Sequence, residues 1–120
     1  MLNIIRIPAF DDNYIWLVHQ QGNQNCAVVD PGDSEPVLEA LQKHQLNLES
    51  ILITHHHPDH IGGVQELVSA TKASVYGPAN EDISELDYKV AEGSEVTLDK
   101  SALNFSVIEV PGHTRGHLAY

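Results

Sequence analysis

The stretch that most constrains this chain runs from a short apolar segment directly into a cluster of histidines, "LESILITHHHPDHIGG" at residues 48–63. Its first part is an apolar run bounded by polar residues, which is typical of a strand buried on both faces. Four of the chain's 8 histidines then fall within residues 55–60, together with Asp59. The sequence therefore requires a fold in which a buried strand ends at a polar, histidine-rich site.

The order of side chains in this cluster favours a metal site over a solvated histidine-rich loop. Alternate side chains of an extended segment point to the same side, so His55 and His57 can bind one ion while His56 points away as a non-ligand. A proline then ends the extended stretch, and Asp59 and His60 follow on a tight turn where a helix begins. Two pairs of ligands suit two metal ions better than one, and the glycine pair at 62–63 leaves space for backbone to pass close by.

Three residues outside the cluster are candidates for the same site. His113, in "VPGHTRGH", again follows an apolar strand and is predicted to be the third ligand of the ion bound by His55 and His57. His117 lies four residues later and is interpreted as a residue that supports a ligand from outside the coordination sphere or simply packs. Asp30 ends a strand in "VVDPG", where it either orients a ligand or forms a turn before proline.

The predicted donor set limits the choice of metal. Imidazoles with one carboxylate and no thiolate are suited to zinc, manganese or iron. The sequence therefore predicts two divalent metal ions, with zinc as the default and iron or manganese as alternatives. The single cysteine, Cys26, lies in the apolar run "CAVV" and is expected to be a small core residue, not a nucleophile.

Composition narrows the class of protein further. The 120 residues allow one domain, and 6 basic against 17 acidic residues give a net charge of −11, which argues against nucleic acid or an anionic membrane as partner. One cysteine permits no intrachain disulfide, in keeping with a reduced, cytoplasmic location. No signal peptide or membrane-spanning run is expected.

Hydrophobic periodicity predicts a strand-rich first part followed by alternating elements. Strands are expected at 2–7, 14–19, 26–30, 48–54 and 73–78, and helices at 35–45, capped by Ser34, and from Val64 to Thr71. Residues 80–88 are expected to form a short helix or loop, residues 95–99 and 103–110 a hairpin, and "GHLAY" the start of another strand. We find no internal repeat and no linker.

In order and spacing, these motifs resemble the metallo-β-lactamase superfamily and, more narrowly, glyoxalase II (hydroxyacylglutathione hydrolase). The similarity is carried by "AFDDNYIW", "AVVDPGD", "ILITHHHPDHIGG", "VYGP" and "VPGHTRGHLAY". It covers the whole chain but only the N-terminal half of a family member. It implies an α+β fold, the four-layer αβ/βα sandwich, with residues 1–120 as the N-terminal part of that domain. The remaining half, with two further metal ligands and a glutathione-binding helical region, lies outside these residues.

The resemblance also implies an activity. His55, His57 and His113 would bind one metal ion, and Asp59 and His60 the other. The intact enzyme would hydrolyse S-D-lactoylglutathione to D-lactate and glutathione, the second step of methylglyoxal detoxification. Catalysis would come from the metal-bound water, with no catalytic side chain beyond it, because a thiol with a pKa of about 8.5 leaves readily. We expect the 120-residue chain alone to be inactive and the intact enzyme to be a monomer.

Two alternatives remain open from the sequence. The parent protein could be another hydrolase of the same fold, which a parallel assay of lactoylglutathione and a β-lactam would distinguish. It could also be a non-catalytic or redox metal-binding protein of that fold. Visible absorbance and metal analysis would separate an iron centre from a zinc centre.

Overall fold

A six-stranded sheet forms the centre of the protein in the computed structural model, which describes residues 2–9, 13–55, 61–79, 83, 86–110 and 118–120. Its strands lie in the order β1-β2-β3-β4-β5-β6. Their bounds are Leu2–Ala9, Asn13–Gln20, Asn25–Val29, Asn47–Leu52, Ser74–Pro78 and Tyr88–Val90. Strands β1, β2 and β3 pair antiparallel as a meander, and β3, β4, β5 and β6 pair parallel.

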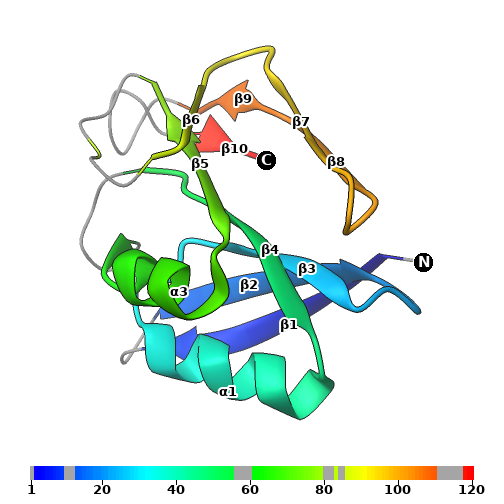
Figure 1. Cartoon of the computed structure of the whole chain (residues 1–120). Helices are drawn as coiled ribbons and strands as arrows, with labels where there is room; N and C mark the ends of the chain where they lie inside the picture. The colour runs from blue at the N-terminus through cyan, green and yellow to red at the C-terminus, as the bar shows by residue number, and fades with distance from the viewer. Residues whose placement is uncertain (1, 10–12, 56–60, 80–82, 84–85, 111–117) are drawn as a thin grey trace.

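Helices and short strands cover opposite faces of this sheet (Figure 1). Helices α1 (Ser34–His44) and α3 (Val64–Thr71) lie on one side. On the other side, β7 (Glu95–Leu98) pairs with β8 (Leu103–Ser106), and β9 (Ile108–Glu109) pairs with β10 (Leu118–Ala119). The predicted α+β fold class is confirmed. Neither helix is long and apolar enough to cross a membrane.

Alternation along the strands gives the sheet two apolar faces. On the helical side, Val37 and Leu41 of α1 and Val64 and Leu67 of α3 pack against inward-facing strand residues. Cys26 belongs to this core with no exposed surface, and burial raises the pKa of its thiol to about 12. The prediction that this cysteine is a core residue is therefore confirmed, because a thiol in such surroundings stays protonated and inert.

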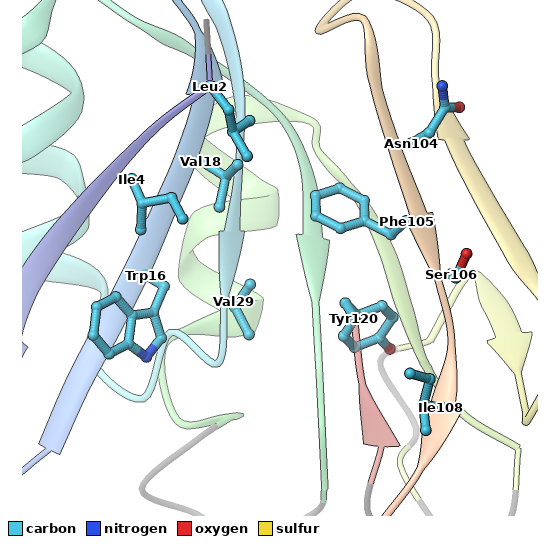
Figure 2. A pocket seen from close by; sticks show the side chains of 10 residues that line it. All are labelled: Leu2, Ile4, Trp16, Val18, Val29, Asn104, Phe105, Ser106, Ile108 and Tyr120. Atoms are coloured by element: carbon cyan, nitrogen blue, oxygen red, sulfur yellow. The ribbon is translucent and has the colours of Figure 1, made fainter.

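The opposite face is only partly covered. A smaller core forms where β7, β8 and the segment near β10 pack on β2, β3 and β4. Beside it lies an open apolar groove of about 630 Å³ (Figure 2). One wall comes from β1 to β3 and the other from β8 to β10, through the residues Leu2, Ile4, Trp16, Val18, Val29, Asn104, Phe105, Ser106, Ile108 and Tyr120. Ile4, in the wall of this groove, is 60% exposed, so the described residues do not cover the groove.

Two local expectations are wrong, each because of a contact distant in sequence, and a third differs at one residue. Of the segment 80–88, expected to be a short helix or loop, residues 80–82, 84 and 85 lie outside the described residues. Residues 83, 86 and 87 belong to no helix or strand, and Tyr88 begins β6 by pairing with Tyr76 of β5. The strand expected at 103–110 is interrupted at Val107, whose N–H donates to the Ser94 carbonyl. The cap of α1 is not Ser34, as the next contact shows.

Asp33 occupies the N-cap position of α1, and its side chain accepts a hydrogen bond from the Glu35 N–H. Ser34 is the first helical residue, and its hydroxyl donates instead to the Glu66 carboxylate on α3. The serine therefore joins the two helices, while the neighbouring aspartate satisfies the helix end.

Gly63 lies where α3 meets the loop that follows β3. A Cβ at this position would come within 2.5 Å of the Ser34 backbone nitrogen and 2.7 Å of the Pro31 carbonyl oxygen. The Gly63 N–H donates to that same carbonyl at 2.8 Å. The predicted close passage of backbone is thus confirmed at Gly63, which fits because it lacks a side chain.

We predict that Gly63→Ala lowers the free energy of unfolding by about 3 kcal/mol, because the new methyl group would meet backbone atoms that cannot move aside. Urea denaturation of the 120-residue chain measures this loss. Gly22→Ala is the matched control: its Cβ meets nothing within 4 Å, but its φ of 85° should still cost about 1 kcal/mol. Equal losses in the two variants would contradict the steric explanation.

Candidate metal centre

The candidate site lies at one edge of the sheet. Strands β3, β4 and β5 run parallel, so their carboxyl ends meet at the same edge. Asp30 follows the last residue of β3, and His55 comes three residues after the end of β4. The parallel pairing therefore brings a carboxylate and an imidazole together from segments 25 residues apart in sequence.

The Asp30 carboxylate is bonded to both donors of Thr54. Its Oδ1 accepts the Thr54 N–H at 2.7 Å, and its Oδ2 accepts the Thr54 hydroxyl. Asp30 is 7% exposed and has a φ of 53°, a left-handed conformation that aspartate tolerates better than most residues. The Asp30 N–H still donates to the Leu52 carbonyl at 2.9 Å, so the backbone turns only after its last pairing with β4.

Thr54 connects Asp30 to His55. The Thr54 Oγ1 lies 2.8 Å from His55 Nδ1. The hydroxyl has one proton, and a carboxylate can only accept, so this proton goes to Asp30 and the hydroxyl oxygen accepts from Nδ1–H. In the neutral imidazole, the lone pair then lies on Nε2. A histidine that binds a metal ion through Nε2 must be in this tautomer.

The same loop after β3 also holds the beginning of α3. Pro31 accepts the Gly63 N–H, and Ser34 donates to Glu66. Asp30 at the start of this loop binds Thr54. Both flanks of the stretch 56–60 are therefore fixed to one short loop, on the near side at Thr54 and on the far side at Gly63.

Strand β10 approaches the same segment from the other side. The Leu118 N–H donates to the Thr54 carbonyl at 2.9 Å, and the Tyr120 hydroxyl donates to the Ile53 carbonyl at 2.7 Å. In sequence, residues 111–117 connect β9 to β10. The segment before His55 is thus bonded to the strand that follows His113 and His117 along the chain.

The structure describes two of the predicted site residues, His55 and Asp30, and brings them together through Thr54. His55 is 2% exposed, as expected of a residue that ends a buried strand. The remaining predicted ligands and the two histidines given other roles lie outside the described residues: His57, Asp59, His60, His113, His56 and His117. Their assignments stay predictions.

Two residues that bond the segment before His55, Thr54 and Tyr120, were not predicted from the sequence. A threonine next to a predicted ligand histidine could have indicated the hydroxyl contact, but its carboxylate partner lies 24 residues away. Tyr120 carries no local signal, because its contact with Ile53 spans 67 residues.

Among the described residues, one predicted ligand, His55, is held in a form that can bind a divalent cation. His55 is buried, and the Thr54 contact selects its Nδ1–H tautomer, so Nε2 is the donor atom. The outer partner of the histidine is a hydroxyl backed by a carboxylate, which fixes the ring and raises the basicity of the ligand nitrogen. A histidine supported in this way is a suitable single ligand for zinc or another metal of similar softness, and the other predicted ligands lie outside the described residues.

Comparison with known sequences identifies close relatives. The family model described as "Metallo-beta-lactamase superfamily" matches residues 9–120. Hydroxyacylglutathione hydrolase of Methylobacillus flagellatus is 53% identical over 120 residues, and that of Vibrio cholerae is 54% identical over 121 residues. Each match covers 100% of this chain and 47% of the relative, so the chain spans about half the length of the curated relatives it matches.

Solved structures share the fold. The B3 metallo-beta-lactamase BLEG-1 superposes with a TM-score of 0.84 at 23% identity, covering 100% of this chain and 66% of the other. ETHE1 from Myxococcus xanthus superposes with a TM-score of 0.80 at 28% identity, covering 98% of this chain and 52% of the other. The match to the family model over nearly the whole chain, supported by these folds, shows that this chain belongs to the metallo-β-lactamase superfamily.

Proposed function

We propose that the whole protein is a hydroxyacylglutathione hydrolase that cleaves S-D-lactoylglutathione to D-lactate and glutathione. The observation that carries this proposal is the identity of 53% to a hydrolase of that name over all 120 residues of the chain. Relatives of this similarity usually share the residues of a site, and the resemblance in the sequence had pointed to the same class. In a cell, the reaction would be the second step of methylglyoxal detoxification.

The proposed centre holds two divalent metal ions, zinc by preference. His55, His57 and His113 would bind one, and Asp59 and His60 the other. When bound, the ions would supply a water molecule that deprotonates near neutral pH and a positive charge for the oxyanion. Asp30 and Thr54 would keep the His55 ring oriented with Nε2 toward the ion.

The substrate places few demands on other side chains. A glutathione thiolate leaves without protonation by a strong acid, because thiols ionise at a pKa of about 8.5. The proposed site therefore requires residues that orient the metal ligands, and it does not require a side chain that protonates the leaving group. We further propose a cytoplasmic, monomeric enzyme with a small-molecule substrate and no nucleic-acid or membrane partner, in keeping with the net charge of −11 and the single buried cysteine.

The proposal predicts that the full-length protein, loaded with zinc, hydrolyses S-D-lactoylglutathione faster than it hydrolyses a β-lactam assayed in parallel. His55→Ala should remove metal content and activity together, with a loss beyond the roughly 10- to 100-fold expected for an outer partner. His44→Ala, at an exposed position on α1, is the matched control and should keep both. A preference for the β-lactam, or full activity in the His55 variant, would exclude the proposal.

We also predict that the 120-residue chain alone hydrolyses S-D-lactoylglutathione no faster than the buffer does. The reason is that these residues match 47% of the relatives' length, and two further ligands and the glutathione-binding region are expected in the other half. Release of free thiol, followed at micromolar protein with excess zinc, measures the rate. Turnover by the isolated chain would show that the missing half is dispensable.

Thr54→Val tests the support of His55. Valine keeps the shape of threonine but removes the hydroxyl between Asp30 and His55, so zinc affinity of the 120-residue chain should fall about 10- to 100-fold. Competition with a chromophoric chelator measures the affinity. Thr54→Ser keeps the hydroxyl and should stay within about threefold of the unmodified chain. If valine and serine variants bind zinc equally well, the hydroxyl does not support the ligand.

A further inference from the structure

Tyr120 makes a partly buried polar contact with the segment that leads to His55. Its hydroxyl donates to the Ile53 carbonyl at 2.7 Å, and its ring meets Phe105 edge-on, with centroids 6.4 Å apart (Figure 2). Burial, together with the nearby Asp30 carboxylate, raises the pKa of Tyr120 well above its usual range. The hydroxyl is therefore protonated, and acts as a donor, throughout the neutral pH range.

The accepting carbonyl belongs to a short segment, Ile53 and Thr54, that is bonded to β5, to the strand β10 and to the candidate site. The Ile53 N–H donates to Tyr76 of β5 at 2.8 Å, and the next residue, Thr54, carries the contacts to Asp30 and His55. The Thr54 carbonyl accepts the Leu118 N–H. Two consecutive carbonyls before His55 are thus bonded to the segment 118–120, one by the Leu118 N–H of β10 and one by the side chain of Tyr120, which follows β10.

Strand β10 is short and depends on these contacts for its place. It consists of two residues, Leu118 and Ala119, and pairs with the equally short β9. A two-residue ladder fixes a strand weakly, so the Leu118 bond to Thr54, the Tyr120 bond to Ile53 and the buried Leu118 side chain add to what holds β10 at the end of β4. Along the chain, this strand comes directly after residues 111–117, which include the predicted ligand His113.

We propose that Tyr120 is a positioning residue of the metal centre, whose hydroxyl fixes the segment before His55 against the strand that follows His113. The inference rests on the metal centre of the proposed function, but not on the identity of the substrate. Two ligands of one ion come from segments far apart in sequence, and the cost of bringing them together is lower when both segments are already bonded to each other. Loss of the hydroxyl should therefore weaken metal binding more than it disturbs the fold.

The test compares the unmodified 120-residue chain with Tyr120→Phe, which keeps the ring against Phe105 and removes only the donor. Zinc affinity, measured by competition with a chromophoric chelator, should fall about threefold to tenfold, the range that one lost hydrogen bond supports. Tyr88→Phe is the matched control, because Tyr88 is 52% exposed and its ring stacks on Tyr76 at 4.7 Å. This control should bind zinc as the unmodified chain does.

Two further measurements separate positioning from a general loss of stability. Amide exchange at Leu118, the donor to Thr54, should be faster in the phenylalanine variant, and circular dichroism should show an unchanged fold. The zinc-induced rise in melting temperature should shrink, whereas a merely structural role would lower the melting temperature equally with and without zinc.

The outcomes decide between the proposals. An unchanged zinc affinity in Tyr120→Phe, with the unmodified chain binding zinc, overturns the positioning role and leaves the proposed function standing. If the unmodified chain binds no zinc at millimolar concentration, the same comparison is made in the full-length protein, which holds the two further expected ligands, and failure of that protein to bind zinc overturns both the positioning role and the centre assigned to these residues. Weaker zinc binding in Tyr120→Phe alone supports the positioning role even if the full-length protein acts on a different thioester.

Discussion

The contact between the Asp30 carboxylate and Thr54 is the interaction on which the organisation of the site depends. A carboxylate that is 7% exposed needs donors, and Thr54 supplies two, its N–H and its hydroxyl. Without these two donors, the buried Asp30 carboxylate would lose hydrogen bonds that replace part of its lost hydration. Because the Thr54 hydroxyl donates its proton to Asp30, its oxygen accepts the proton of His55 Nδ1. The lone pair of the neutral imidazole is then on Nε2, where it can bind a cation.

This contact acts together with a second one that involves no side chain. Gly63 passes so close to Pro31 and Ser34 that any Cβ would collide with backbone, and its N–H bonds the Pro31 carbonyl. The loop after β3 is therefore hydrogen-bonded to the chain on both sides of the histidine cluster, at Thr54 and at Gly63. For the proposed metal centre, such anchoring would lower the entropy that the predicted ligands of this stretch lose on binding an ion.

Sequence patterns predicted those parts of the structure that local periodicity controls. The alternation in the first three strands and the helical spacing of Val64 and Leu67 follow from which faces are buried. What could not be predicted depends on partners distant in the chain. Ser34 is not the cap because Glu66 takes its hydroxyl, and Thr54 joins the site because Asp30 turns toward it. The histidine spacing indicated a metal site, but no spacing rule reveals the hydroxyl that orients a ligand.

The two faces of the sheet contribute differently to this site. The helical face is closed by a continuous core, and the strand segment leading to His55 is buried in it through Ile53. The other face carries the open apolar groove (Figure 2). Tyr120 belongs to both regions, since its ring lines the groove while its hydroxyl bonds the Ile53 carbonyl. The open face of the sheet and the buried segment that leads to His55 therefore share one side chain, which contributes its ring to the first and its hydroxyl to the second.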